Sequence, residues 1–224
     1  MPAPQLDLSN DDLLATTRAV RKRLDFDRPL PMEVIEECLE LAVQAPTGSN
    51  AQGWQFVFVT DPAKKVKIGE YYAQAWSLYE NMPFAIHNLN RGTGDQALEA
   101  SQERSTSSAE YLAQNMARAP VLMIPCITAR TDSAESSGVL SQASTWGSII
   151  PATWNFLLAA RARGVAGAWT TLHLMHEEAV AELLGIPFDE FMQVALIPLA
   201  YSKGTQFKRA YRPPVDQIMH VNSW

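Results

Sequence analysis

Hydrophobic residues along this chain recur with two different spacings. In several segments they lie three or four residues apart, as on the buried face of a helix, and one clear example runs from Ile35 to Ala45 and stops at Pro46. Another helix is predicted to begin at Asp61-Pro62, because Asp61 is a suitable N-cap and proline fits the first helical position. On these grounds the predicted helices cover residues 13–23, 35–45, 62–79, 111–118, 142–163 and 177–184.

In the other segments hydrophobic residues are adjacent or alternate with polar ones, and such short runs predict strands. The run PVLMIPCIT at 120–128 is continuous, which suits a strand that is buried on both faces. Further strands are predicted over 55–60, 165–171 and 192–201. Because helices and strands do not alternate regularly, an α+β sandwich, with a sheet covered by helices, fits better than a doubly wound sheet.

Three other features interrupt this pattern. Pro151 lies within the predicted 142–163 helix and must either kink that helix or mark its first turn. Residues 81–108 are polar and rich in glycine and serine, which predicts a mobile excursion, and 131–138 is predicted as a polar loop. Residues 202–224 are first basic and proline-containing and then apolar and aromatic, which is typical of a tail that wraps around another surface.

Composition narrows the classes of function. The 224 residues are 47% hydrophobic, enough for the core of one domain or of two tightly joined subdomains. Charged residues make up only 19%, and a surface covered by a partner subunit would explain this low figure. A net charge of −6 argues against nucleic acid as the main partner. The first 12 residues do not resemble a signal peptide, and no run approaches the roughly 20 apolar residues of a membrane span, so we expect a cytoplasmic protein with no membrane partner.

Cysteine and histidine do not form a recognisable metal or redox motif. Cys38 and Cys126 lie far apart within apolar stretches and are expected to be reduced core thiols. The four histidines lack the spacing of metal ligands, so no metal site is expected. Nucleophile elbows, Walker loops and dinucleotide-binding glycine motifs are also missing, which suggests that a bound cofactor supplies the reactive group and that no side chain is an obligate catalyst.

Three segments are candidates for holding such a cofactor. Arg18 and Arg21 would share one face of the 13–23 helix, whose N-cap is Ser9 or Asn10, and could clamp a phosphate, although solvated basic faces are more common. The polar loop 46–54 could grip a heterocycle or ribityl chain, or be an ordinary turn. Residues 169–171 follow two glycines at a predicted strand end, where backbone N–H groups could reach a flat ring or where an aromatic residue simply joins the core.

These segments, in this order, resemble the nitroreductase-like family of FMN enzymes. The family's Arg-Arg-Ser-x-Arg segment corresponds to Thr17-Arg18-Ala19-Val20-Arg21. Its Ala-Pro-Ser-x-x-Asn-x-Gln-Pro-Trp loop, the most specific element, corresponds to residues 45–54, APTGSNAQGW. Its C-terminal Arg-x-Pro and Val-x-x-Trp correspond to 212–214 and 221–224. The match covers nearly the whole chain, and it departs from the family at Thr17, Ala19 and Gly53.

The resemblance implies an intertwined homodimer of nitroreductase-like α/β sandwiches, each with a mixed, mostly antiparallel sheet covered by helices. Residues 1–224 would form one domain, with a substrate lid near 81–108 and a dimer-wrapping tail near 205–224. Two FMN molecules would bind between the subunits, and Lys208 or Arg209 would assist at the phosphate. The expected cofactor-binding residues are Arg18, Ala19, Arg21, Trp169, Thr170, Thr171 and Arg212 from one chain and Pro46, Thr47, Gly48, Asn50 and Gln52 from the loop of the other.

The activity implied by the resemblance is electron transfer from NADH or NADPH to a nitroaromatic, quinone or similar small-molecule acceptor by a ping-pong mechanism. Two alternatives remain open at this point. One is a specialised FMN enzyme that fragments flavin or removes halogen, and the other is a dimeric binding module without redox turnover.

Overall fold

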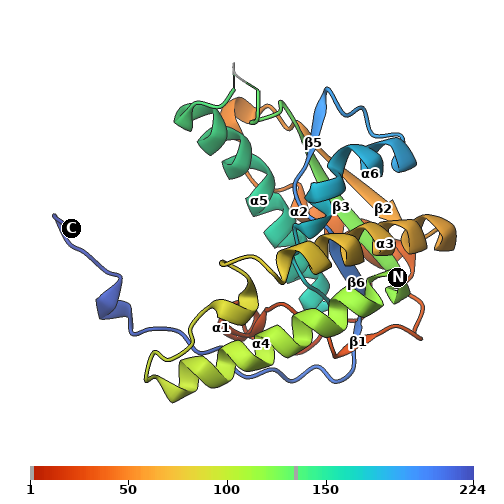
Figure 1. Ribbon diagram of the computed structural model, residues 1–224. Coiled ribbons are helices and arrows are strands. Elements are labelled where there is room, and N and C mark those ends of the chain that lie inside the picture. The colour runs from red at the N-terminus through yellow and green to blue at the C-terminus, as the bar shows by residue number, and fades with distance from the viewer. Residues whose placement is uncertain (1–2, 134–135) are drawn as a thin grey trace.

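The centre of the fold is strand β3, Val121–Thr128, in which every residue except Thr128 is buried. The computed structural model describes residues 3–133 and 136–224, so two residues of the predicted 131–138 loop lie outside it (Figure 1). Strand β3 pairs with β2, β5 and β6, while β6 also pairs with β1 and β4, and all these pairings are antiparallel. The remaining strands are β1 Leu24–Asp25, β2 Trp54–Val59, β4 Val165–Gly167, β5 Phe191–Gln193 and β6 Ile197–Ser202.

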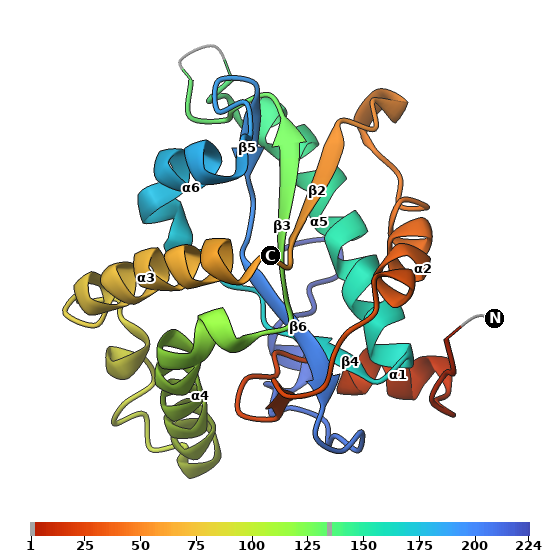
Figure 2. The same cartoon turned by 90° about the vertical axis from the view of Figure 1, so that its right-hand side faces the viewer.

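Helices cover both faces of this sheet, as Figure 2 shows. Alternate β3 residues, such as Leu122 and Ile124, pack in one apolar cluster with residues of α3, α4 and α6. The residues between them, such as Val121 and Met123, pack in a second cluster with α2 and α5. The helices are α1 Asn10–Thr16, α2 Met32–Ala42, α3 Pro62–Tyr79, α4 Gln96–Asn115, α5 Val139–Ala162 and α6 Glu177–Leu184, and the short 3-10 turns are η1 Gly48–Asn50, η2 Ile86–Asn88, η3 Met116–Arg118, η4 Leu172–His176 and η5 Val215–Gln217.

The predicted α+β sandwich is therefore confirmed, and several elements match closely. Helix α3 begins after Asp61, whose carboxylate accepts the N–H groups of Ala63 and Lys64. Helix α6 ends at Gly185, which has a left-handed φ of 71°. Cys38 and Cys126 are buried free thiols, as predicted. Within the described residues, no helix is both long enough and apolar enough to cross a membrane.

The predicted helix over 13–23 is wrong. Helix α1 is capped by Ser9, as predicted, but ends at Thr16. The hydroxyl groups of Thr16 and Thr17 each donate to a carbonyl four residues back, and Thr17 is already extended. Four residues after the helix ends, the N–H of buried Val20 donates to the carbonyl of Gly167 at 2.9 Å. This tertiary contact draws the chain off the helix axis, so Arg18 and Arg21 do not share a helix face.

Three other boundaries differ from the sequence prediction. Helix α4 begins at Gln96 rather than near 111, because Asp95 caps the mostly polar run QALEASQER, which is rich in good helix formers. The strand predicted over 192–201 is two strands, and they flank Pro125 of β3, which lacks the N–H needed for a continuous ladder. The strand predicted over 165–171 ends at Gly167, apart from one bridge between Thr170 and Leu196. Pro151 lies in the interior of α5, not in its first turn.

Candidate functional site

A basic cleft lies at the end of the molecule where α1, α4 and the start of the C-terminal tail meet. Residues 18–23, Ser108 and 206–208 line this cleft, whose volume is about 460 Å³. The guanidinium of Arg18 donates to the carbonyl of Lys208 at 3.2 Å, and that of Arg21 donates to the hydroxyl of Ser108 at 3.3 Å. The predicted phosphate-binding pair and Lys208 therefore face one hollow, although they come from opposite ends of the chain.

The charge of this basic cleft is not neutralised within one chain. No carboxylate in the described parts of the protein forms an ion pair with Arg18, Arg21 or Lys208. Desolvation by burial lowers the pKa of Arg21, and the nearby Tyr72 opposes that effect. A guanidinium that is partly removed from water and has no counter-ion fits an anionic ligand, since it would gain charge-assisted hydrogen bonds.

The strand end after β4 adjoins the basic cleft. Trp169 lines a smaller pocket of about 100 Å³ together with Arg18 and Ala19. Just before this strand end, Gly167 lets β4 lie close to β6, because a Cβ there would lie 2.9 Å from the carbonyl oxygen of Pro198.

Tyr72, which the sequence analysis did not single out, links the strand end to the cleft. Burial raises the pKa of the Tyr72 hydroxyl, and its neighbours Thr170 and Arg21 oppose that rise. Thr171 is exposed at the same strand end. The structure thus brings the predicted residues 18, 19, 21 and 169–171 together.

The loop 46–52 has an unusual backbone. Ser49, Asn50 and Gln52 all have positive φ values, of 52°, 54° and 48°, a region that non-glycine residues visit rarely and at some cost. The loop is held by the hydroxyl of Thr47, which accepts the N–H of Gln52, and by hydrogen bonding between the side chains of Asn50 and Gln52. The neighbouring Gly53 leaves room for the hydroxyl of Thr128, which a Cβ at position 53 would meet.

Within one chain this loop lies far from the basic cleft. The N–H of Gly48 donates to the hydroxyl of Ser148 on α5, whereas Arg161, near the other end of α5, contacts Thr16 beside the cleft. Thirteen residues separate Ser148 from Arg161, which corresponds to about 20 Å along a helix. Figure 2 shows the same separation, with the loop (orange, upper right) and α1 (red, below) at opposite ends of α5. The structure therefore does not bring the loop residues to the cleft of their own chain.

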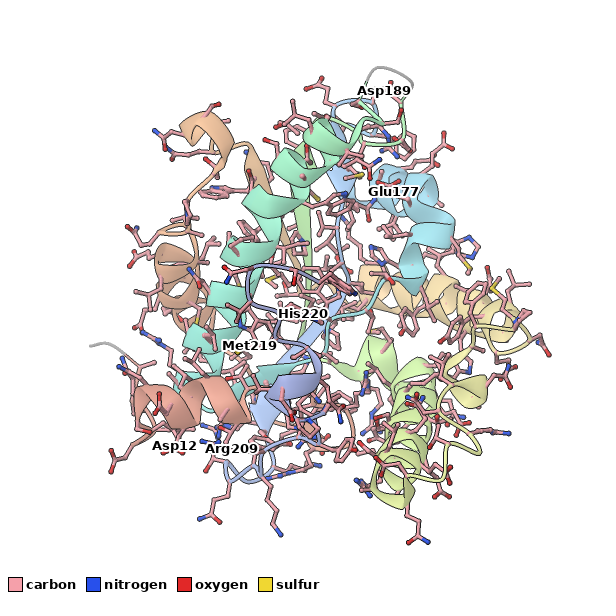
Figure 3. The ribbon with its side chains drawn as sticks, turned by 90° about the vertical axis from the view of Figure 1, so that its left-hand side faces the viewer. Asp12, Glu177, Asp189, Arg209, Met219 and His220 are labelled. Atoms are coloured by element: carbon pink, nitrogen blue, oxygen red, sulfur yellow. The ribbon has the colours of Figure 1, made fainter. Side chains whose placement is uncertain are left out.

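Arg212 is also not brought to the cleft. The tail passes along α4, where the hydroxyl of Tyr211 donates to Asp95, and Arg212 then contacts only the carbonyl of Tyr211 among the hydrogen bonds of the described residues. In Figure 1 the last residues run away from the body, and Figure 3 places Arg209 at the same end of the molecule as Asp12 of α1. Of the tail residues predicted to bind the phosphate, Lys208, Arg209 and Arg212, it is Lys208 that lines the basic cleft.

Several contributors to the site have no sequence signal. Tyr72, Ser108, Phe207 and Arg161 belong to no motif, and they reach the cleft only through the packing of α3, α4, α5 and the tail. No group of three or more potential metal ligands occurs among the residues that the structure describes.

Comparison with known proteins identifies similar sequences and folds. A family model described as the nitroreductase family matches residues 14–201. Iodotyrosine deiodinase 1 of Rattus norvegicus is 41% identical over 59 residues, which are 26% of this chain and 20% of that protein. Iodotyrosine deiodinase of Haliscomenobacter hydrossis is 48% identical over 42 residues, which are 19% of each chain. The matched region thus spans about a fifth of the length of these curated relatives.

Solved structures resemble the whole chain at low sequence identity. An oxidized iodotyrosine deiodinase bound to FMN and 3-iodo-L-tyrosine has a TM-score of 0.68 and 23% identity, covering 95% of this chain and 98% of that one. An FMN- and NADPH-dependent nitroreductase from sphigopyxis sp. strain HMH has a TM-score of 0.68 and 18% identity, covering 97% of this chain and 100% of that one. A BluB-like flavoprotein from Clostridium difficile has a TM-score of 0.69 and 16% identity, covering 96% and 100%. At these identities the likeness supports the fold.

Proposed function

This chain belongs to the nitroreductase family, and from that premise we propose that it is an FMN-dependent oxidoreductase that acts as a homodimer. The observation that carries the proposal is the unneutralised cleft around Arg18 and Arg21, next to the small pocket at the strand end that Gly167 and Trp169 line. An anion-binding cleft beside a surface for a flat ring suits a ligand that combines a phosphate with an aromatic system. FMN is such a ligand.

Each part of the proposed site has its own task. Arg18, Arg21 and Lys208 would bind the phosphate, and residues 169–171 would contact the flavin ring. When bound, FMN supplies a ring that takes up a hydride from NADH or NADPH and passes electrons to a second substrate. The protein residues bind, orient and polarise, and none of them needs to act as an acid or base.

The remaining part of the site comes from a second copy of the chain. Loop 46–52 contacts α5 at Ser148, about 20 Å along the helix from Arg161 on the cleft side, so a partner's loop is proposed to complete each site. Large apolar side chains are exposed along α5 and in the tail, which supports a surface that a second copy covers. They are Val139, Leu140, Ile150 and Trp154 on α5 and Val215, Ile218, Met219, Val221 and Trp224 in the tail. We propose that the tail wraps around the partner and that Arg212 serves the site in the dimer.

Two acceptor classes fit this proposal. The first is a nitroaromatic or quinone reduced with electrons from NAD(P)H. The second is a halogenated aromatic, and a specific observation favours it: the segments that match the curated iodotyrosine deiodinases are 41% and 48% identical. Both reactions use the same bound flavin, so the acceptor distinguishes them.

The proposal is tested with the purified protein. We expect a yellow dimer with about one flavin per chain, whose absorbance bleaches when NADPH or NADH is added without oxygen. Steady-state rates with nitroaromatic, quinone and halotyrosine acceptors then assign the acceptor class, and parallel double-reciprocal lines are expected from ping-pong kinetics. A colourless protein that does not take up added FMN would contradict the proposal and favour a binding module without redox turnover.

The polar segment 81–108 is proposed to form part of the substrate lid. It comprises an irregular stretch around η2 and the first half of α4, whose buried residues lie only from Ala109 onward. Exchanging residues 81–104 for the corresponding segment of another family member is expected to change the preferred acceptor and its KM severalfold, since lids commonly set specificity. Flavin content should stay the same, because the exchange spares Ser108, and loss of FMN would argue against this division of roles.

A further inference from the structure

The start of the C-terminal tail is held by two arginines that share one aromatic ring. The guanidinium carbon of Arg23 lies 4.3 Å from the centroid of the Phe207 ring, and that of Arg161 lies 4.8 Å from it. Arg23 also donates to the carbonyls of Lys203, Gly204 and Gln206, and Arg161 donates to that of Thr205 at 2.8 Å. Two side chains thereby satisfy four consecutive carbonyls, 203–206, and their aromatic partner follows directly.

Holding the tail with two arginines that have no counter-ion is electrostatically unfavourable. Arg161 is 5% exposed, its Nε has no hydrogen-bond partner, and no described carboxylate pairs with it or with Arg23. Burial, followed by the charge of Arg23, lowers the pKa of Arg161. Two like charges close to one ring repel each other, and an anion nearby would relieve that repulsion.

Phe207 lies where this anchor meets the candidate site. It lines both the basic cleft and the small pocket of Trp169. The next residue, Lys208, supplies the carbonyl that accepts from Arg18. If the chain at Phe207 moved, the Lys208 carbonyl and Arg18 would move with it, although Phe207 itself offers no polar atom to a ligand.

We propose that Phe207, held between Arg23 and Arg161, is a positioning residue that places Arg18 and Lys208 at the anion-binding end of the cleft. Through Phe207, binding of an anion in the cleft is linked to docking of the tail on the rest of the chain. Because such linkage is reciprocal, a phosphate in the cleft should hold the tail, and a docked tail should strengthen phosphate binding. The flavin part of this inference rests on the proposed function, whereas the link between anion and tail does not.

The first test compares two flavins that differ only in the phosphate. Phe207→Leu keeps an apolar side chain but removes the π face, so we expect it to weaken binding of FMN about tenfold and that of riboflavin less than about twofold. Phe207→Tyr should restore FMN binding, because it keeps the ring. The matched control is Phe188→Leu, which removes another ring that an arginine covers, Arg130 at 4.1 Å, but far from the cleft.

The second test needs no flavin. Trypsin can cleave after Lys208, which is exposed, and inorganic phosphate should slow this cleavage in flavin-free wild type but not in Phe207→Leu. Protection by phosphate without any flavin uptake would uphold the link and refute the proposed function. An unchanged ratio of FMN to riboflavin affinity in Phe207→Leu, or equal phosphate protection in wild type and variant, would overturn the inference, as would the same losses in Phe188→Leu.

Discussion

Arg21→Ala is expected to lower the affinity for FMN about a hundredfold. The guanidinium is half-buried, lies beside Tyr72 and has one long hydrogen bond, to Ser108, so its charge is free to pair with a phosphate. A hydrogen bond to a charged group contributes about 1.5–3 kcal/mol, and 1.4 kcal/mol corresponds to a factor of ten. Fluorescence titration of the flavin-free protein with FMN measures the effect.

Two comparisons make this result specific. Arg28→Ala removes an exposed arginine that lies over Tyr201, outside the cleft, and should leave the FMN affinity unchanged. Riboflavin affinity should fall only slightly in Arg21→Ala, because riboflavin has no phosphate. An unaltered FMN affinity in Arg21→Ala would remove this arginine from the proposed site.

The same variant tests whether each site is shared between two chains. In a mixed dimer, one chain carries Arg21→Ala and the other Asn50→Gly, a change that removes the amide without straining the positive φ of 54°. If each site takes its arginines from one chain and its loop from the other, the mixed dimer keeps one intact site and about half the FMN. If both parts came from one chain, the mixed dimer would bind as poorly as either variant alone.

The contiguous motifs were the predictable part of the candidate site. The 46–54 loop could be recognised because its residues are adjacent in sequence, and the structure places 46–52 in one largely exposed turn with positive φ at three positions, just before the buried Trp54 opens β2. The β3 strand could be predicted for a similar reason, since a continuous apolar run fits only a strand with helices on both faces. The loop and the strand are both determined by neighbouring residues, so the sequence pattern is sufficient to predict them.

The remaining features depend on contacts between distant segments. The end of α1 is set by Val20 binding Gly167, nearly 150 residues away, which no helical propensity reveals. Tyr72 and Phe207 join the site through tertiary packing, and their neighbours in sequence are ordinary for a helix and a tail. Polarity also misled the prediction at 96–108, because the side of the helix that faces the body there is itself mostly polar, so the segment lacks the apolar periodicity that marks a helix.

His173 is expected to make the protein acid-sensitive. It lies in η4, two residues after Thr171, is fully buried, and neither of its ring nitrogens has a hydrogen-bond partner within the described residues. Burial lowers its pKa from 6.5 to about 3, so the folded protein keeps the ring neutral. Between these two values the unfolded chain binds a proton and the folded one does not. The free energy of unfolding should therefore fall as the pH falls, by about 1.4 kcal/mol per unit and about 5 kcal/mol in all.

His173→Leu isolates this effect. The variant should be more stable by about 1 kcal/mol at pH 7.5, because two buried polar atoms without partners are removed. Its advantage should then grow by about 1.4 kcal/mol for each pH unit below 6.5, while carboxylates that titrate at lower pH contribute equally to both proteins. His220→Leu, in the exposed tail, is the control and should parallel the wild type. Urea denaturation of flavin-free protein from pH 7.5 to 4.5 gives these values, and parallel curves for wild type and His173→Leu would show that this imidazole is protonated in the folded state as readily as in the unfolded one.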